Sequence, residues 1–268
     1  MGILNITPDS FSDGGLYLAT DKAIEHAYDL IDNGASIIDI GGESTRPGFE
    51  AITVSDECKR IVPVIQELRD GDAILSTDTY KYEVAKCAIE EGCKILNDIN
   101  GLMDDEGENK ARLVAANDAY VVLMYNRRII SESDDVIKDA RETLSRSVDI
   151  ALASGVAEDK IIIDPGIGFG TTREEDRRLT LELAAINPAA FPILYACSRK
   201  RFITCLDFGE GTDATWVANM IAVANGASML RVHDPEPFAK YMADYIEGEG
   251  AQANLAHVKE VLEWTRLS

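Results

Sequence analysis

Short apolar runs alternate with longer amphipathic segments along the whole chain. Each run is rich in β-branched and other apolar residues and ends in polar residues or turn formers, a pattern typical of parallel strands that are buried on both faces. We predict eight such strands: Ile3–Asn5, Ser36–Ile40, Ala73–Thr77, Lys94–Asn97, Tyr120–Met124, Ile161–Asp164, Pro192–Tyr195 and Ser228–Val232.

The segments between these runs carry the periodicity of helices. We predict helices over Asp21–Asn33, Ser55–Arg69, Lys81–Glu91, Asp134–Ser154, Arg173–Ile186, Asp213–Asn225 and Pro235–Glu247. A glycine lies at the expected end of four of them, which is a common helix stop: Gly34, Gly92, Gly155 and Gly226. The charged run Asp104–Glu108 has no such periodicity, so we predict a solvated loop there.

Strands that alternate with helices over about 250 residues are typical of a (β/α)8 TIM barrel. An open doubly wound sheet is the competing fold, but no G-x-G-x-x-G motif follows the first strand. No linker or low-complexity segment divides the chain. We therefore predict an α/β protein with one barrel domain over residues 1–268.

Composition narrows the partners and the compartment. The chain has 26 Lys and Arg against 47 Asp and Glu, a net charge of −21, which argues against nucleic acid or an anionic membrane as a partner. No apolar run is long enough to span a bilayer. The five cysteines form no CxxC pair and no signal peptide is visible, so we expect free thiols and a cytoplasmic location. Because the first strand is short, we expect the natural chain to begin upstream of Met1.

Short carboxylate and amide side chains lie where three predicted strands end. Active sites of TIM barrels lie at the carboxyl ends of the strands, so Asp78, Asn97 and Asp164 should meet there. Their acceptors suit the edge of a flat heterocycle with several N–H donors, and Asp164 could accept two parallel hydrogen bonds from an aminopyrimidine. Asp164 could instead cap its own loop, because Pro165 and Gly166 follow it directly.

Cationic and donor side chains follow the last two predicted strands. Lys200, Arg231 and His233 lie where barrels of this type often hold phosphate. A local basic pocket in such an acidic protein predicts a site for an anionic substrate. We expect Asp39, by contrast, to be structural, buried and hydrogen-bonded to backbone.

The remaining histidines do not suggest a metal centre. His26 and His257 lie in helical stretches and should face solvent. The chain has no HExxH motif and no cluster of His and Cys, so we do not expect a zinc ion held by protein ligands alone.

Seven motifs at these strand ends occur in the order found in one family. They are Asn5-Ile6-Thr7-Pro8-Asp9-Ser10-Phe11-Ser12-Asp13-Gly14-Gly15, Gly42-Glu43-Ser44-Thr45-Arg46-Pro47-Gly48, Asp78-Thr79-Tyr80, Asn97-Asp98-Ile99, Asp164-Pro165-Gly166-Ile167-Gly168-Phe169-Gly170, Ser198-Arg199-Lys200 and Arg231-Val232-His233. The chain resembles the dihydropteroate synthase family of folate biosynthesis over nearly its whole length.

The resemblance implies a homodimeric TIM barrel that joins 4-aminobenzoate to a dihydropterin diphosphate and releases pyrophosphate. It places the pterin ring against Asp78, Asn97, Asp164, Lys200, Phe169 and Met124. It places the diphosphate against Asn5, Arg231 and His233, with Asn5 also a ligand of Mg²⁺. It places Thr45, Arg46 and Pro47 in a loop that closes over the diphosphate and 4-aminobenzoate. We expect that closure builds the 4-aminobenzoate pocket from Thr45, Pro47 and Ser198 to Lys200, and we expect catalytic roles for Asp9, Arg46, Lys200 and Arg231.

Two positions depart from the family pattern. Most members carry Lys where this chain has Thr171, and His where it has Tyr125. We expect both changes to lie beside the pterin pocket. They leave open a paralogue that binds a pterin without making dihydropteroate, a methyltetrahydrofolate-type methyltransferase, or a non-catalytic binding module. The loop 7–15 with Arg46 and Lys200 favours the synthase over the methyltransferase.

Overall fold

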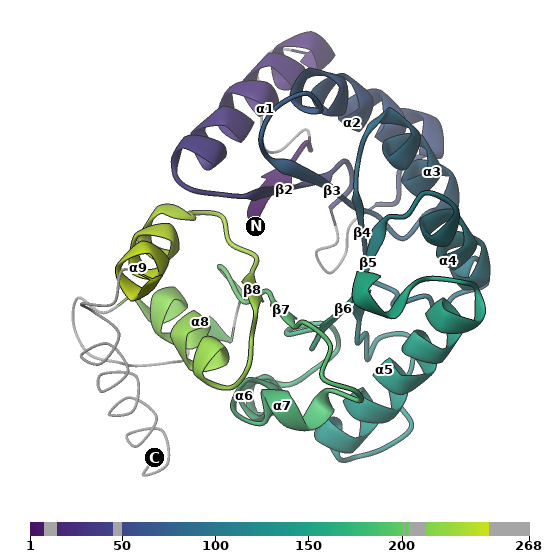
Figure 1. Ribbon diagram of the computed structural model, residues 1–268, viewed down its shortest axis with the longest axis vertical. Coiled ribbons are helices and arrows are strands. Elements are labelled where there is room, and N and C mark those ends of the chain that lie inside the picture. Colours follow the sequence, from purple (N-terminus) through teal and green to yellow (C-terminus); the bar gives the residue numbers. More distant parts are fainter. Residues whose placement is uncertain (8–14, 45–49, 201, 204–212, 247–268) are drawn as a thin grey trace.

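Eight parallel strands form a closed ring in the computed structural model, which describes residues 1–7, 15–44, 50–200, 202–203 and 213–246. Six of them pair in sequence order, namely β1 (Gly2–Asn5), β2 (Ile37–Gly41), β3 (Ile74–Asp78), β4 (Ile95–Asp98), β5 (Tyr120–Met124) and β6 (Ile161–Asp164). A second sheet pairs β7 (Leu194–Tyr195) with β8 (Met229–Leu230). Parallel bridges Gly2–Val232 and Ile163–Ile193 join the two sheets at both edges, which confirms the predicted barrel (Figure 1).

Alternate residues of each strand face opposite sides of the ring, as the two-residue period of a strand requires. Ile95, Val122, Ile162 and Leu194 form one apolar cluster, contributed by four consecutive strands. Their neighbours along the strands, such as Leu96, belong to the larger core beneath the helices. Burial on both sides explains why these strands read as continuous apolar runs.

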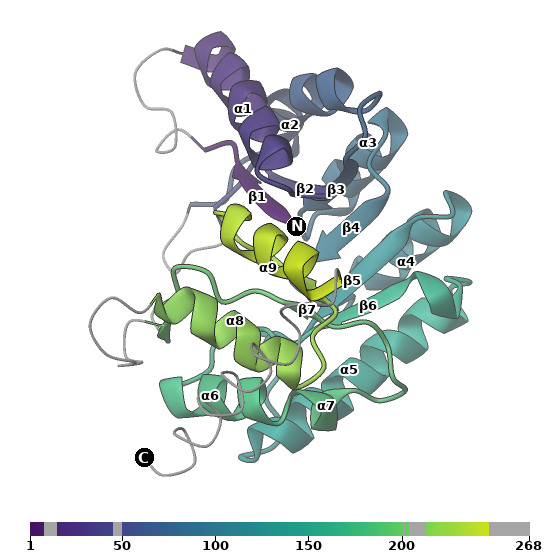
Figure 2. The same ribbon diagram turned by 60° about the vertical axis from the view of Figure 1, so that its left-hand side comes forward.

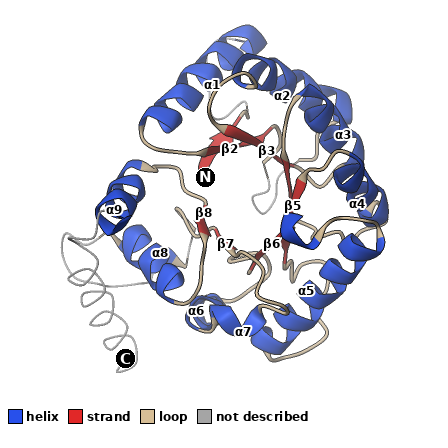
Figure 3. Ribbon diagram, viewed as in Figure 1, coloured by secondary structure: helices blue, strands red, loops and turns tan. Residues whose placement is uncertain are grey.

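Helices form an outer layer around the strands (Figure 3). They are α1 (Gly15–Asp32), α2 (Val54–Leu68), α3 (Tyr82–Glu91), α4 (Gly107–Ala116), α5 (Val136–Ala153), α6 (Arg173–Leu181), α7 (Leu183–Ile186), α8 (Ala214–Ala224) and α9 (Glu236–Ile246), with a 3-10 turn η2 (Glu158–Lys160) before β6. The predicted helix Arg173–Ile186 is divided into α6 and α7 at Glu182. None of the helices in the described part of the chain is both long and apolar enough to cross a membrane.

Glycine stops occur where the sequence predicted them. Gly34, Gly92, Gly155 and Gly226 all have positive φ, between 90° and 133°. Gly34 has a second role, because a Cβ at this position would lie 2.4 Å from the Cβ of Ala239 on α9. Glycine therefore lets the last described helix pack against the turn after the first one, where the ring of helices closes (Figure 2).

The prediction of a solvated loop over Asp104–Glu108 is wrong in part. Helix α4 begins at Gly107, and Asp104 accepts a hydrogen bond from the buried ammonium of Lys110 at 2.8 Å. The apolar stripe of α4 is hard to recognise because Lys110 occupies one of its buried positions, beside Ala111 and Val114. A charged residue at a buried position interrupts the apolar periodicity, and for this reason α4 was not predicted from the sequence.

Candidate active site

The carboxyl ends of the strands bring most of the predicted site residues together. Asn5, Asp78, Asn97, Met124 and Asp164 end or nearly end β1, β3, β4, β5 and β6. Ser198 and Lys200 follow β7, and Arg231 and His233 follow β8. Asp9, Thr45, Arg46 and Pro47 lie outside the described residues, and so does His257. His26 is exposed on α1, as predicted.

Asp39 is the centre of a buried network of side chains. Its Oδ1 accepts a hydrogen bond from the Ser76 hydroxyl at 2.5 Å, and its Oδ2 accepts from Asn97 Nδ2 at 3.0 Å. Arg231 Nε donates to the same Oδ2 at 2.6 Å. The prediction of a structural, buried Asp39 is right about its burial, but its partners are side chains of the site rather than backbone.

A carboxylate within the apolar sequence Ile37-Ile38-Asp39-Ile40 is itself a signal, because a buried charge requires a partner. That signal could have added Asp39 to the predicted site. The partner itself was hidden, since Arg231 lies 192 residues away in the chain.

Arg231 bridges two carboxylates. Its Nη2 donates to Asp78 Oδ2 at 2.6 Å, while Nε binds Asp39. Burial lowers the pKa of Arg231, but the negative charges of Asp39 and Asp78 outweigh it and raise the pKa. The guanidinium therefore stays charged and is held in one orientation.

Asp78 has one oxygen left for a ligand. Its Oδ1 is buried and accepts no hydrogen bond from the described residues. Burial raises the pKa of Asp78 to about 7, the charge of Asp39 adds to this effect, and Arg231 opposes it. A buried acceptor without a donor is costly in a folded protein, so this oxygen is a candidate contact for the N–H groups of a ligand.

Asp164 is buried below the turn that follows β6. Its Oδ1 accepts a hydrogen bond from the Gly166 amide at 2.7 Å. One of its two oxygens therefore caps the loop, as the alternative prediction stated. Burial raises the pKa of Asp164, and the ammonium of Lys200 opposes that rise. The charges of Asp164 and Lys200 therefore stabilise each other.

Lys200 lies across the loop after β6. Its ammonium donates to the Ile167 carbonyl at 2.6 Å and lies 4.8 Å from the centre of the Phe169 ring. Burial lowers the pKa of Lys200, and Asp164 opposes that change. The Arg128 guanidinium lies 4.7 Å from the same ring. Two cations therefore lie within cation–π distance of the Phe169 ring.

An apolar wall completes this part of the site. Phe169, Met124 and Ile99 form one buried cluster, and Tyr80 packs against it. Phe169 and Met124, which the family resemblance places against the pterin ring, lie together in this cluster. A flat ligand could pack on this wall while its polar edge meets the acceptors.

His233 and Ser198 pair beside these groups. The Ser198 hydroxyl lies 3.0 Å from His233 Nδ1, which links the loops after β7 and β8. On the neighbouring strands β1 to β3, Gly41 separates Asn5 from Asp78. A Cβ at Gly41 would lie 3.6 Å from Asn5 Oδ1 and 3.5 Å from the Cβ of Asp78. Asn5 thus lies on the rim, next to the buried acceptors.

The two departures from the family pattern have different surroundings. The Thr171 hydroxyl donates to Asp176 Oδ1 at 2.5 Å and accepts from the Gly168 amide at 3.1 Å, so it holds the loop of the site. Tyr125 is fully buried in the core under the helices, and its hydroxyl donates to Asp139 on α5 at 2.7 Å. The expectation that both changes lie beside the pocket is wrong for Tyr125, because its side chain packs between the strands and the helices, on the outer side of the barrel.

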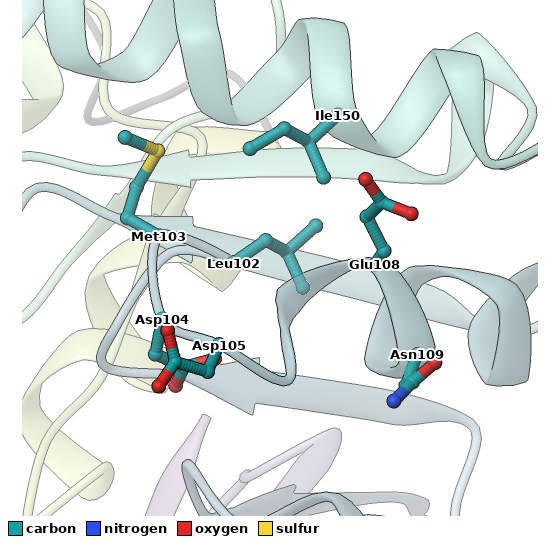
Figure 4. Close-up of a pocket in the computed structure, with 7 residues that line it drawn as sticks. All are labelled: Leu102, Met103, Asp104, Asp105, Glu108, Asn109 and Ile150. Carbon is teal, nitrogen blue, oxygen red and sulfur yellow. The ribbon is translucent and has the colours of Figure 1, made fainter.

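A separate surface depression lies between α4 and α5 (Figure 4). Its lining consists of Leu102, Met103, Asp104, Asp105, Glu108, Asn109 and Ile150, none of them a residue of the predicted site. Within the described ranges, no three or more His, Cys, Asp or Glu side chains form a group suited to a metal ion.

The fold and these side chains define a class: a (β/α)8 barrel whose strand ends can hold a flat heterocycle with an anionic group. The family model of the pterin binding enzymes matches residues 1–233, and the chain belongs to that family.

Curated relatives and solved structures agree with this assignment. The dihydropteroate synthase of Bacillus subtilis (strain 168) is 43% identical over 247 residues, which cover 90% of this chain and 85% of the relative. That of Clostridium beijerinckii is 41% identical, covering 87% of this chain and 88% of the relative. The Clostridium difficile enzyme, solved with pteroic acid, has a TM-score of 0.83 at 37% identity and covers 92% of this chain and 95% of its own. The Xanthomonas albilineans enzyme, solved with 4-aminobenzoic acid, has a TM-score of 0.83 at 34% identity and covers 92% of each chain.

Proposed function

We propose that this chain is an enzyme of folate biosynthesis, a transferase that condenses 4-aminobenzoate with (7,8-dihydropterin-6-yl)methyl diphosphate. The products are 7,8-dihydropteroate and pyrophosphate. The observation that carries the proposal is the buried Oδ1 of Asp78, which accepts from none of the residues that the structure describes, next to a guanidinium that Asp39 and Asp78 hold in place. Relatives solved with 4-aminobenzoic acid and with 7,8-dihydropteroate support the same substrates and product.

The pterin ring would be recognised by acceptors on one edge and by an apolar wall on its face. Asp78 Oδ1 and the second oxygen of Asp164 accept hydrogen bonds from ring N–H and amino groups, and Asn97 is held beside them by Asp39. The ring packs against Phe169 and Met124, whose positions Lys200 and the β6 loop maintain. These contacts orient the methylene carbon that the amine attacks.

Stabilisation of charge supplies the chemistry. An arylamine is already a neutral nucleophile, so the site needs no strong general base. The leaving diphosphate requires positive charge, and Arg231 and His233 offer donors after the end of β8, where Ser198 of the loop after β7 lies 3.0 Å from His233 Nδ1. Cationic character that develops on the pterin is stabilised by the carboxylates of Asp78 and Asp164. Preorganised groups of this kind lower the barrier because they do not have to reorient during the reaction.

The donor set on the rim fits a magnesium ion that arrives with the diphosphate. Mg²⁺ commonly takes one or two protein oxygens and fills its other positions with phosphate oxygens and water. Asn5 Oδ1 offers such an oxygen next to Gly41. When bound, Mg²⁺ would neutralise charge on the leaving diphosphate, in addition to what Arg231 supplies.

We also propose that the enzyme is a cytoplasmic homodimer. The family resemblance supports both statements, and free cysteines at positions 58, 87, 93 and 197 are in keeping with a reducing compartment. Light scattering after gel filtration would report the mass of the particle, and a monomer at micromolar concentration would contradict the dimer.

Pyrophosphate release from dihydropterin diphosphate and 4-aminobenzoate tests the function directly. We expect release only when both substrates are present, with dihydropteroate formed in equal amount. The matched control is Ser145→Ala, since Ser145 is a half-buried residue of α5, away from the strand ends, whose hydroxyl donates to the Arg141 carbonyl in the described chain. If the protein binds the pterin but releases no pyrophosphate, it is a non-synthesising paralogue and the proposal fails.

A further inference from the structure

Lys110 on α4 is a fully buried cation outside the proposed substrate contacts. Its ammonium lies 2.7 Å from Asp98 Oδ2, 2.8 Å from Asp104 Oδ2 and 3.0 Å from the Tyr80 carbonyl oxygen. The side chains of Lys110 and Asp98 are both 0% exposed. A lysine ammonium has three protons, so all of its donor capacity is used.

These three acceptors belong to two strand ends of the site. Asp98 directly follows Asn97 on β4, and Tyr80 comes two residues after Asp78 on β3. Asp98 also accepts hydrogen bonds from the amides of Asn100 and Leu102, both at 3.0 Å, so its carboxylate holds the loop after β4. One side chain thereby ties the loop that follows Asp78 to the loop that follows Asn97.

Stability alone gives little reason for such an arrangement. Desolvation of two buried charges costs about as much as their attraction returns, and an apolar replacement of a buried pair is often neutral or stabilising. Burial raises the pKa of Asp98, and the charge of Lys110 opposes it, which illustrates the two competing effects. What the arrangement supplies is a fixed geometry, because three acceptors hold the Lys110 nitrogen in one position.

We propose that Lys110 is a positioning residue for pterin binding. It ties the loop after β3 to the loop after β4, beyond the ladder that pairs Asp78 with Asn97, and so holds Asp78 Oδ1 and the Asn97 amide in place for the edge of the pterin ring before the ligand arrives. This inference rests on the proposed function, because it assumes that Asp78 and Asn97 contact the pterin. Lys110 itself acts through the backbone of Tyr80 and the carboxylates of Asp98 and Asp104.

The test compares three variants with the wild type. Lys110→Met keeps most of the length of the side chain but leaves the buried charge of Asp98 without its cation, so it will lose stability. The double variant Lys110→Met with Asp98→Asn removes that charge, while the amide oxygen can still accept from the loop amides. Lys160→Met is the matched control, since it removes an ion pair with Asp118 at the opposite end of β6.

Calorimetry with 6-hydroxymethylpterin and steady-state kinetics supply the readouts. For the double variant we expect a melting temperature close to that of the wild type, but about ten-fold to a hundred-fold weaker pterin binding. KM for the pterin diphosphate should rise by a similar factor while KM for 4-aminobenzoate changes little. Lys160→Met should bind the pterin as the wild type does.

Wild-type pterin affinity in a folded double variant would overturn the positioning role. Should the double variant not fold, Asp104→Ala removes one partly exposed acceptor of Lys110 and leaves the buried pair with Asp98 intact; pterin affinity must then fall measurably, and an unchanged affinity would again overturn the proposal. Failure of the wild type to bind 6-hydroxymethylpterin would instead contradict the proposed function, so the two failures are distinguishable.

Discussion

Three buried carboxylates of the site differ in what binds each of their oxygens. Asp39 uses both oxygens within the protein, Asp164 uses one for its own turn, and Asp78 has one buried oxygen to which none of the described residues donates. At the scale of single residues, this division separates groups that hold the site from groups that face a ligand.

Asp164→Asn should abolish tight pterin binding and leave the fold intact. An amide that still caps Gly166 through its oxygen must present N–H donors where the ring also presents donors. Each buried mismatch costs about 1–3 kcal/mol. Calorimetry with a pterin lacking the diphosphate measures the effect, and circular dichroism checks the fold. Unchanged affinity would remove Asp164 from the binding site.

Pterin affinity should strengthen as the pH rises through neutrality. The pKa of Asp78 is raised to about 7, mainly by burial, so its ionised fraction grows between about pH 6 and about pH 8. Only the ionised form leaves both oxygens as pure acceptors for N–H donors. Titrations across this range should show the change, and Asp78→Asn should bind weakly with a flatter profile. An equally steep profile in Asp78→Asn would assign the titration to another group.

At the scale of elements, backbone conformation decides the shape of the loop after β6. Gly166 has φ of 70°, and a Cβ there would lie 1.7 Å from the Tyr125 carbonyl oxygen. The loop that carries Phe169 therefore packs directly against the end of β5. No side chain can occupy this position without moving one of the two.

Gly166→Ala should destabilise the protein more than Gly226→Ala does. Both glycines have positive φ, which costs an alanine about 1–2 kcal/mol, but a Cβ at Gly226 meets nothing within 4 Å. The backbone clash at Gly166 should add to that cost and weaken pterin binding as well. Urea unfolding of both variants measures the difference. Equal losses of unfolding free energy would contradict the close approach.

At the scale of the whole molecule, the net charge of −21 opposes an anionic substrate. Arg231 and Lys200 oppose that field only locally, and both lie beside carboxylates. A divalent cation that arrives with the diphosphate would reduce the repulsion, which is a long-range effect and is screened by salt.

Turnover should therefore vanish in excess chelator and return when Mg²⁺ is added. Binding of 6-hydroxymethylpterin, which carries no phosphate, should be unaffected by the chelator. The measurement is pyrophosphate release with and without EDTA, beside calorimetry under the same conditions. Full turnover in the chelator would show that the protein cations suffice.

Much of this architecture could be predicted from local sequence. The apolar runs identified every strand to within a few residues, because a strand buried on both faces needs continuous apolar sequence. Four glycines located helix ends, because only glycine adopts their positive φ without strain. Asp78, Asn97 and Asp164 could be placed at one end of a barrel because parallel strands all point the same way.

Only the tertiary structure determined which charged side chains pair with one another. The bonds from Arg231 to Asp39 and Asp78 span most of the chain, and nothing in local sequence specifies such a pair. The same is true of the outward side chain of Tyr125 and of the buried Lys110, whose charge concealed α4. Local sequence determines which backbone conformations are low in energy, whereas a buried charge is tolerated only where the folded chain brings an opposite charge close to it.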